Sequence, residues 1–418
     1  MFAWLLAPLL IWRLHRPGPD HDGLKHRRGE RLGKMTPSDN QPIWVHAASV
    51  GEVNAARGLI DGLRRRFPDY PVLLSTFTVS GALHAERVLG DKADDQLSHR
   101  FLPVDSLSCV KRWLNATAPR IGIIVETEIW PELFEQAARR QLPLVMVNAR
   151  LSDKTMRQSR RFKRLYARAL AHVDLALCQS DMDAERLKAL GVDSEQVEVS
   201  GNLKFDNPLP ADTLQSARTL RQDWGLRPTW VAGSTRPGEE AIILNTHAQL
   251  LAERPDALLV LAPRHPERCE EVIELIEAAG LRWRRIDQAG EEEQKVVLVD
   301  KLGVLTACYA ASQVCFVGGS LAPFGGHNLL EPAALGKPVL AGPFLDQQQA
   351  AADALSQSDA VAMVEDAESL AEAIAELWQH PELALARGRA ALGVVESGRG
   401  ALRLTLERIG QRLSAEAG

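Results

Sequence analysis

The chain has 418 residues, which at roughly 100–200 residues per domain predicts two or three domains. Hydrophobic residues make up 45% and charged residues 25%, a balance typical of soluble globular proteins that excludes a disordered, collagen-like or coiled-coil chain. The 49 basic and 54 acidic residues give a net charge of −5, which argues against a general nucleic-acid-binding protein. The five cysteines form no C-x-x-C motif, so we interpret them as buried thiols in a reducing compartment.

The N-terminal segment combines an apolar run with a basic flank. Residues 1–12 carry no charge, but a membrane-spanning helix needs about 20 apolar residues. Residues 13–34 hold seven Lys/Arg and three Asp/Glu, a local charge of +4, and this order is not that of a cleaved signal peptide. We therefore predict that residues 1–35 associate with the cytoplasmic side of the cell inner membrane. The alternative is a helix that packs on its own protein.

From residue 42 onward, short apolar runs alternate with amphipathic stretches of about 10–15 residues. This pattern predicts parallel strands covered on both faces by helices. It is interrupted by the Pro-rich segment 206–210 and then starts again. We predict an α/β protein of two doubly wound, Rossmann-like domains facing each other, residues 36–206 and residues 207–418 with the C-terminal helices. Ligands of such sheets bind beyond the carboxyl ends of the strands, so the cleft between the domains is the expected site.

Three acidic or basic positions in the first half follow predicted strands. Ser49-x-x-Glu52 reads either as a helix capping box or as a carboxylate available for general-base catalysis. Glu126 and Glu128 end a buried strand, where an acid is costly unless it caps the next helix or serves a site. Lys204, at the domain junction, either reaches into the cleft or is a solvent-exposed hinge residue.

Two further first-half motifs have a structural and a functional interpretation. Residues 154–168 contain seven cations and no acid, which is typical of a solvated helix face but also suits a phosphate or an anionic membrane. Asp181-x-Asp183 follows Ser180, so we interpret it as a helix start rather than a metal site. The sequence predicts no other metal-ligand cluster.

The second half carries polar or glycine-rich loops after successive predicted strands. Residues 233–240 open a helix and predict an anion site formed by free backbone N–H groups. Further loops contain Arg264, the pair Gly318-Gly319, and the run from Gly325 to Glu331, whose acid could bind ribose hydroxyls. Each loop alone reads as a tight turn, whereas together they indicate a nucleotide pocket. The loops match neither the G-x-G-x-x-G nor the P-loop pattern.

As a set, these motifs resemble the 3-deoxy-D-manno-octulosonic acid (Kdo) transferases of lipopolysaccharide biosynthesis, which are GT-B glycosyltransferases. The resemblance covers nearly the whole chain. It rests on Arg27-Arg-Gly-Glu-Arg-Leu-Gly33, Ala48-Ser-Val-Gly-Glu52, Glu126-Thr-Glu-Ile-Trp-Pro131, Gly201-Asn-Leu-Lys-Phe-Asp206, Pro263-Arg-His-Pro266 and Gly325-Gly-His-Asn-Leu-Leu-Glu331. It implies inverting, metal-independent transfer of Kdo from CMP-Kdo to a lipid A precursor, a tetraacyldisaccharide bisphosphate, without a cofactor.

The resemblance also implies roles for particular residues. Glu52 corresponds to the general base, and Glu126 and Lys204 correspond to residues that stabilise the transition state. The implied CMP site, in the second domain, consists of Pro263, Arg264, Leu302, Gly303, Val304, Asn328, Leu329, Leu330 and Glu331. Residues 36–206 then bind the acceptor. The chain departs from many relatives at Leu302-Gly303-Val304, where they carry Met-Gly-Glu, and at 343–348, where they carry Pro-His-Thr-x-Asn-Phe.

The sequence also allows two other functions. Another GT-B glycosyltransferase could use a nucleoside diphosphate sugar in place of CMP-Kdo. A two-lobed architecture also fits a non-enzymatic solute-binding protein, but that class predicts a cleavable signal peptide, which the N-terminal pattern does not indicate.

Overall fold

A computed structural model describes residues 22–37, 40–89, 96–151, 155–157, 163–207, 209–288 and 294–415. The described chain divides into two compact units: unit 1 contains residues 22–207 and 398–415, and unit 2 contains residues 209–397. The prediction placed all C-terminal helices in the second domain. The last helix, α17 (Ala401–Ala415), instead belongs to unit 1, because its apolar face packs against the core of that unit.

Each unit contains one seven-stranded sheet in the described residues, and every pairing is parallel. The strands of unit 1 are β1 (Ile43–His46), β2 (Val72–Thr76), β3 (Leu97–Phe101), β4 (Ile121–Val125), β5 (Leu144–Ala149), β6 (Leu175–Cys178) and β7 (Val197–Val199). Those of unit 2 are β8 (Thr229–Thr235), β9 (Leu258–Pro263), β10 (Trp283–Arg285), β11 (Val296–Leu298), β12 (Val314–Val317), β13 (Val339–Ala341) and β14 (Val361–Met363). The predicted α/β class with two doubly wound sheets is confirmed.

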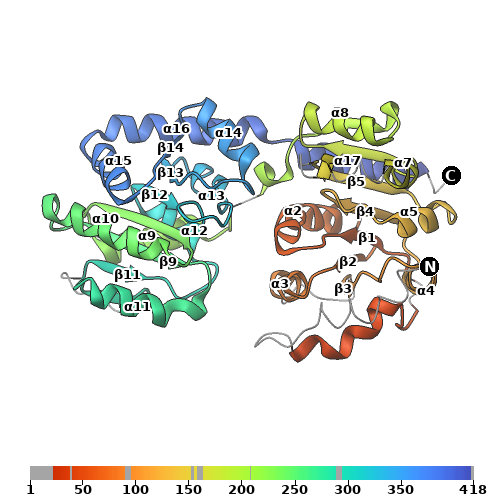
Figure 1. Ribbon diagram of the computed structural model, residues 1–418, viewed down its shortest axis with the longest axis horizontal. Coiled ribbons are helices and arrows are strands. Elements are labelled where there is room, and N and C mark those ends of the chain that lie inside the picture. Colours follow the sequence, from red (N-terminus) through yellow and green to blue (C-terminus); the bar gives the residue numbers. More distant parts are fainter. Residues whose placement is uncertain are drawn as a thin grey trace. The chain divides into compact units, whose positions relative to one another are not determined.

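Helices connect the strands as crossovers (Figure 1). In unit 1 the helical segments are η1 (Asp22–Leu32), α2 (Val50–Arg66), α3 (Val79–Leu89), α4 (Leu107–Thr117), α5 (Pro131–Ala138), α7 (Lys163–Leu170), α8 (Asp181–Leu190), η3 (Ser194–Gln196) and η4 (Leu203–Asp206). In unit 2 they are α9 (Thr213–Trp224), α10 (Glu239–Glu253), η5 (Pro266–Arg268), α11 (Cys269–Ala278), α12 (Leu305–Ala311), α13 (Leu330–Ala333), α14 (Gln349–Gln357), α15 (Ala367–Gln379) and α16 (Pro381–Gly398).

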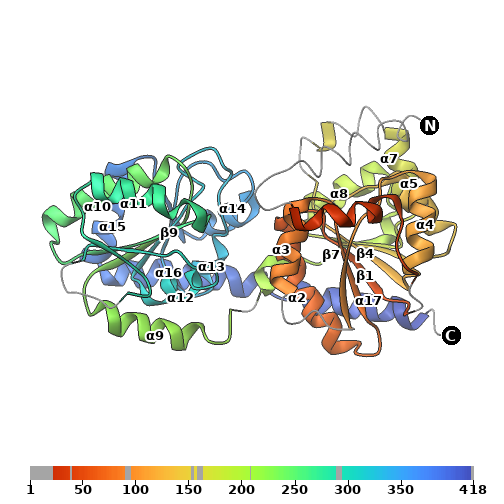
Figure 2. The same ribbon diagram turned by 90° about the horizontal axis from the view of Figure 1, so that it is seen from below.

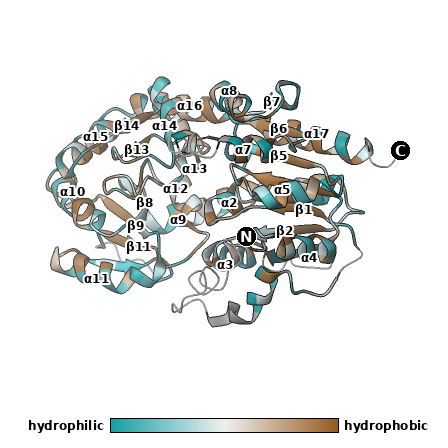
Figure 3. Ribbon diagram, turned by 45° about the vertical axis from the view of Figure 1, so that its right-hand side comes forward, coloured by the Kyte–Doolittle hydropathy of each residue, from teal (hydrophilic) through white to brown (hydrophobic). Residues whose placement is uncertain are grey.

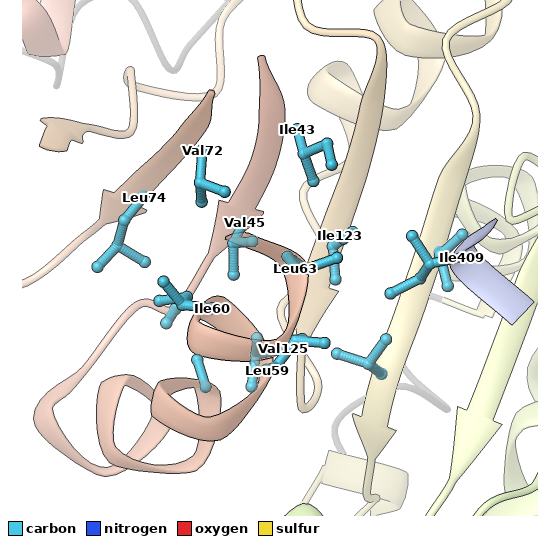
Figure 4. Close-up of a cluster of buried hydrophobic side chains, with 14 of the residues drawn as sticks. Ile43, Val45, Leu59, Ile60, Leu63, Val72, Leu74, Ile123, Val125 and Ile409 are labelled. Carbon is cyan, nitrogen blue, oxygen red and sulfur yellow. The ribbon is translucent and has the colours of Figure 1, made fainter. Parts of the chain in front are cut away.

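The unit 1 sheet separates two apolar cores, because successive strand residues point to opposite faces. Ile43 and Val45 of β1 lie in the core that contains α2 and α17, whereas Trp44 lies in the core that contains α4, α5, α7 and α8. Figure 2 shows α2 and α17 on the same side of this sheet. In Figure 4, Ile409 of α17 lies with the strand side chains of the first core, which explains why the last helix belongs to unit 1. The strands are hydrophobic along most of their length (Figure 3), as burial on both faces requires.

Segment η1 is tied to unit 1 by two of the arginines of the predicted basic flank. Arg27 pairs with Glu30 and Glu86, and the Arg31 guanidinium is buried, 4.2 Å from the Phe101 ring centroid. These two cations therefore serve internal packing. None of the helices in the described ranges is long and apolar enough to span a membrane. The apolar run 1–12 lies outside the described residues.

Candidate active site

The switch point of the unit 1 sheet lies between β1 and β4. These strands are neighbours in the order β3-β2-β1-β4-β5-β6-β7, and the connections after them run toward opposite edges. A crevice beyond the carboxyl ends of two such strands is where doubly wound sheets bind ligands. Glu52 lies in the first turn of α2, directly after β1, and Glu126 follows β4. The topology therefore brings two of the predicted catalytic residues to the same place.

Glu52 does not form the capping box that the Ser49-x-x-Glu52 spacing allowed. Within the part of the chain that the structure describes, Ser49 is the N-cap of α2 but makes no side-chain capping bond. Its hydroxyl instead donates to Glu52 Oε1 at 3.2 Å, and the Ala48 N–H donates to Oε2. The carboxylate is thus held by one hydroxyl and one amide before the helix.

Glu126 and Glu128 are likewise free of a capping role in α5, because another residue fills it. The Asp105 carboxylate accepts hydrogen bonds from the N–H groups of Glu132 and Leu133, at 3.1 and 2.9 Å. Glu126 has a φ of +60°, a backbone conformation that costs a non-glycine residue energy and is concentrated at functional sites. The structure therefore favours a site role for this carboxylate pair over the alternative of helix capping.

Lys204 lies in η4, and its side chain reaches the Glu126 carboxylate. Its Nζ is 4.0 Å from Glu126 Oε1, and 21% of its side chain is exposed. The interpretation as a solvent-exposed hinge lysine is therefore wrong. All three predicted catalytic residues belong to unit 1 and come from the ends of β1, β4 and β7.

Burial and mutual repulsion perturb the acids of this cluster. Burial raises the pKa of Glu52 to about 8, with the charges of Glu128 and Glu126 adding to the effect and the Ala48 and Ser49 hydrogen bonds opposing it. Burial also raises the pKa of Glu128 to about 7, with a further contribution from the charge of Glu126. A carboxyl group that titrates near neutral pH can accept a proton from a substrate and later release it. Sequence reasoning noted Glu128 beside Glu126 but did not assign it to the site.

In unit 2, three predicted CMP-site residues lie close together. Arg264 follows β9, and its N–H donates to Thr235 O at 3.0 Å. Asn328 Nδ2 donates to Glu331 Oε1 at 3.2 Å. Burial raises the pKa of Glu331, and the Asn328 hydrogen bond and the positive charge of Arg264 oppose that rise. This cluster contains donors, an acceptor and a cation, as binding of a nucleotide requires.

The other predicted CMP-site residues differ in what they expose. Leu329 and Leu330 are 0% and 4% exposed, so their side chains belong to the core. Leu302 is half-exposed, Gly303 has a φ of +88°, and Val304 is the N-cap of α12. Pro263 is the last residue of β9. At Leu329 and Leu330, contact with a ligand is therefore restricted to the backbone.

The anion site predicted for residues 233–240 is filled by the protein's own carboxylate. Glu239 is fully buried and accepts hydrogen bonds from four backbone N–H groups, those of Arg236, Gly319, Ser320 and Leu321, at 2.7–2.9 Å. The prediction of free amides is wrong for Arg236, because Glu239 of the same segment accepts its N–H, and the other three donors belong to the loop after β12. Glu239 joins the loops after β8 and β12, which flank the switch point of this sheet.

Sequence reasoning missed a group of cationic and aromatic side chains beside Arg264. Arg236 Nη1 lies 2.6 Å from His265 Nε2, and its guanidinium lies 4.4 Å from the Phe324 ring centroid. His327 is largely buried, and its Nε2 has no hydrogen-bond partner among the described residues. Burial lowers the pKa of His327 to about 4, and the charges of Arg264 and Arg236 contribute. Arg236, His265 and His327 lie within motifs that the sequence analysis named, but it gave their side chains no role.

The remaining predicted features have simpler outcomes. Arg168 of the basic run donates to Glu135 at 3.0 Å, so the run is partly compensated, and Lys154, Arg160 and Arg161 lie outside the described residues. Ser180 caps α8 by accepting from Asp183 N, which confirms the helix-start interpretation. The five cysteines are buried and free. Across the described ranges, no group of three His, Cys, Asp or Glu side chains is arranged to hold a metal ion.

Comparison with known proteins identifies the family. A family model described as 3-deoxy-D-manno-octulosonic-acid transferase matches residues 26–207. The chain is 36% identical over 417 residues to the 3-deoxy-D-manno-octulosonic acid transferase of Bordetella pertussis, covering 97% of this chain and 96% of the relative. It is also 36% identical over 324 residues to the enzyme of the same name from Haemophilus influenzae, covering 76% and 75% of the two chains.

A solved structure supports the fold independently. The UDP-GlcNAc 2-epimerase of Neisseria meningitidis matches with a TM-score of 0.60 and 13% identity, covering 88% of this chain and 100% of that one. At this identity the match shows the fold alone, which is the two-unit α/β architecture of GT-B UDP-sugar enzymes. The two relatives, together with the family model, show that the chain belongs to the 3-deoxy-D-manno-octulosonic acid transferase family of glycosyltransferases.

Proposed function

We propose that the chain transfers Kdo from CMP-Kdo to a hydroxyl of a lipid A precursor, a tetraacyldisaccharide bisphosphate, with inversion and without a metal ion. The observation that carries this proposal is the group at the unit 1 switch point, where Glu52, with a pKa raised to about 8, lies near Glu126, which in turn lies 4.0 Å from Lys204. A carboxylate with this pKa is suited to take a proton from an attacking hydroxyl near neutral pH.

The proposed reaction is a single displacement. The acceptor oxygen forms a bond to the anomeric carbon of Kdo, the bond from that carbon to the CMP phosphate oxygen breaks, and CMP leaves with the electron pair. Glu52 takes the hydroxyl proton. Attack on the face opposite the leaving group inverts the anomeric configuration, as in inverting glycosidases.

Charge stabilisation falls to fixed protein groups in this proposal. The Lys204 ammonium, held 4.0 Å from Glu126, is a preorganised cation of the kind that lowers a barrier when charge develops. CMP is a monophosphate leaving group and carries less charge than a nucleoside diphosphate, so side-chain cations suffice. In unit 2, Arg264, Asn328 and Glu331, with Pro263 and the 302–304 turn, hold the CMP moiety.

We also propose that the enzyme works at the cytoplasmic side of the inner membrane. The apolar run 1–12 and the cations of segments 13–34 and 154–168 other than Arg27, Arg31 and Arg168 support this location, because basic segments are attracted to anionic lipid. A phosphorylated lipid acceptor requires access to such a surface.

One assay tests the reaction. The purified chain is incubated with CMP-Kdo and the tetraacylated precursor, with and without EDTA, and products are followed by mass spectrometry. We expect a mass increase of one or more Kdo units in both conditions, and inverted anomeric configuration by NMR. An unmodified acceptor would overturn the proposed activity, loss of product with EDTA would overturn metal independence, and a retained configuration would overturn inversion.

A further inference from the structure

Asn148 occupies an unusual position at the end of β5. It has a φ of +54°, in the left-handed region where asparagine is among the few non-glycine residues tolerated. Its side chain is fully buried, and the pairing of β5 with β6 shifts register between Met146 and Ala149. Such a local distortion of a strand re-aims side chains next to a site. The position therefore demands an explanation beyond packing.

The Asn148 side chain holds the segment that carries Lys204. Its Oδ1 accepts a hydrogen bond from Leu203 N at 3.0 Å, in a buried environment. Asn202 Oδ1 accepts from Lys204 N at 3.0 Å, which fixes the next amide of the same turn. The Asp206 carboxylate accepts from the N–H groups of Gly400 and Leu402, both at 2.8 Å. The short helix η4 is thus fixed at both ends, and Asn148 is the residue that ties it to the central sheet.

The same strand end also holds Glu126. The Glu126 N–H donates to Val147 O at 2.9 Å, one residue before Asn148. The Asn148 carbonyl accepts from Gln179 Nε2 at 3.0 Å. Residues 147 and 148 therefore contact Glu126 and Leu203, the residue before Lys204, one through the backbone and the other through a side-chain oxygen.

One half of the Asn148 amide is left without a partner. Its Nδ2 is buried and makes no hydrogen bond to any described residue. Leaving a buried donor unpaired costs about 1–3 kcal/mol, so the Asn148 Nδ2 calls for an explanation. The Oδ1 assignment is chemically fixed, because only the oxygen can accept from an amide N–H.

We infer that Asn148 is a positioning residue for Kdo transfer, which sets the Lys204 ammonium relative to Glu126 through its hydrogen bond to Leu203 N. This inference rests on the proposed function, in which Lys204 stabilises the transition state. Removing the Asn148 side chain leaves the Leu203 N–H unpaired and frees η4 to move, and a displacement of about 1 Å in a reacting group costs on the order of 100-fold in rate.

The test compares Asn148→Gly with Gln141→Gly. Glycine tolerates the left-handed backbone but lacks the acceptor, so the variant removes the hydrogen bond, together with the rest of the buried side chain, without straining the backbone. Gln141 has a φ of +55° and is solvent-exposed in the same unit, so it controls for the backbone change. We expect Asn148→Gly to lower kcat/KM for Kdo transfer by about 10–100-fold and Gln141→Gly to leave it unchanged.

A double-mutant cycle with Lys204→Ala separates positioning from mere stability. If Asn148 acts through Lys204, Asn148→Gly lowers the activity of the Lys204→Ala enzyme by less than about threefold, because the group it positions is already gone. A loss that multiplies in the double variant, or an Asn148→Gly enzyme with wild-type kcat/KM, would overturn the inference. An inactive wild-type chain, or an unaffected Lys204→Ala enzyme, would instead refute the proposed function or the proposed role of Lys204.

Asn148→Asp keeps the inference testable where the glycine variant does not fold. Aspartate retains an acceptor for Leu203 N and tolerates the left-handed conformation. We expect Asn148→Asp to fold and to lose less activity than Asn148→Gly. Leucine has no acceptor and does not tolerate the left-handed conformation, so Asn148→Leu should also lose more activity than Asn148→Asp. A loss in Asn148→Asp equal to that of Asn148→Leu would show that the acceptor oxygen has no part in positioning.

Discussion

The switch points of the two sheets carry acidic residues in opposite circumstances. In unit 2, Glu239 and Glu240 are both fully buried, and each carboxylate is saturated, Glu239 by four backbone N–H groups and Glu240 by Arg268 and Thr235. In unit 1, the Glu52 carboxylate accepts hydrogen bonds from one amide and one hydroxyl, and Glu126 Oε1 lies 4.0 Å from Lys204 Nζ.

This difference distinguishes a carboxylate that stabilises the fold from one that is available for catalysis. A saturated carboxylate is an internal counterpart for backbone donors and fixes two loops together. An undersaturated carboxylate near other acids has a raised pKa and keeps a lone pair available for a substrate proton. The same strand–loop–helix geometry therefore serves stability in unit 2 and, in our proposal, catalysis in unit 1.

The largest expected effect is on turnover. Glu52→Gln removes the proposed base while preserving its shape, and we expect kcat for Kdo transfer to fall by about 10²–10⁴-fold with an unchanged circular dichroism spectrum. Glu195→Gln, an exposed acid of the same unit, is the control and should be neutral. Near-normal turnover in Glu52→Gln would reduce Glu52 to a structural acceptor, like Glu239.

The corresponding substitution in unit 2, at Glu239, should lower the stability of the fold. Glu239→Gln directs an NH₂ group toward two backbone donors, so we expect the free energy of unfolding to drop by about 2–4 kcal/mol in urea titrations. Glu253→Gln, at the exposed end of α10, serves as the control. If Glu239→Gln unfolded at the wild-type urea concentration, saturation of this carboxylate would contribute little to the fold.

Nucleotide binding tests the cluster around Arg264. A ligand that binds only the folded state stabilises it, by about 2.7 kcal/mol at 100 times its Kd. We expect CMP to raise the melting temperature and UDP to raise it less, and Arg264→Ala to weaken the CMP response. A larger shift with UDP would favour the alternative of a nucleoside diphosphate sugar donor.

The pH dependence follows from the raised pKa of Glu52. The group must be ionised to act as a base, so activity should rise with pH up to about 8. Glu128→Gln removes a neighbouring negative charge and should shift this acidic limb toward lower pH. An unchanged limb would show that Glu128 does not influence the base.

The raised pKa of Glu52 also makes stability depend on pH, but stability falls as pH rises, whereas activity should rise. Between pH 4.5 and about 8 the folded chain holds a proton on Glu52 that the unfolded chain has lost, so stability falls as pH rises through this window. Glu52→Gln should therefore raise the melting temperature by a few degrees at pH 8 but not at pH 4.5. An equal change at both pH values would point to a packing effect instead.

The smallest effect concerns the basic run. Charge reversal at Arg157, Arg160 and Arg161 should raise the KM for the phosphorylated lipid acceptor several-fold at low salt, and less at high salt because ions screen the attraction. An unchanged KM would identify these arginines as a solvated helix face.

The central strands were predictable because both of their faces are buried. Largely unbroken apolar runs such as residues 121–125 and 144–147 leave little alternative to a parallel sheet. The sequence analysis did not identify strands β3 and β10, and each of them lies at one edge of its sheet. In β3, Leu97, His99 and Phe101 are buried and alternate with exposed residues, so that strand lacks the continuous apolar signal.

The sequence predicted which residues the candidate site contains and their order along the chain, but not the contacts that they make. Glu52, Glu126 and Lys204 each had an equally acceptable structural interpretation along the chain. What distinguishes them is the partner of each polar atom: Asp105 caps α5 in place of Glu126 or Glu128, and Ala48 donates to Glu52. Asp105 comes from a distant segment, so local spacing contains no information about it, whereas Ala48 is only four residues from Glu52.

By itself, the sequence determined the α/β class, the succession of two strand–helix series and the order of the polar loops, because hydrophobic periodicity is a local property of the chain. The tertiary structure decided which carboxylates are saturated and which are not, and it returned α17 to unit 1. The physical reason is that desolvation and hydrogen-bond satisfaction depend on everything that surrounds a group, whereas periodicity depends only on its neighbours in sequence.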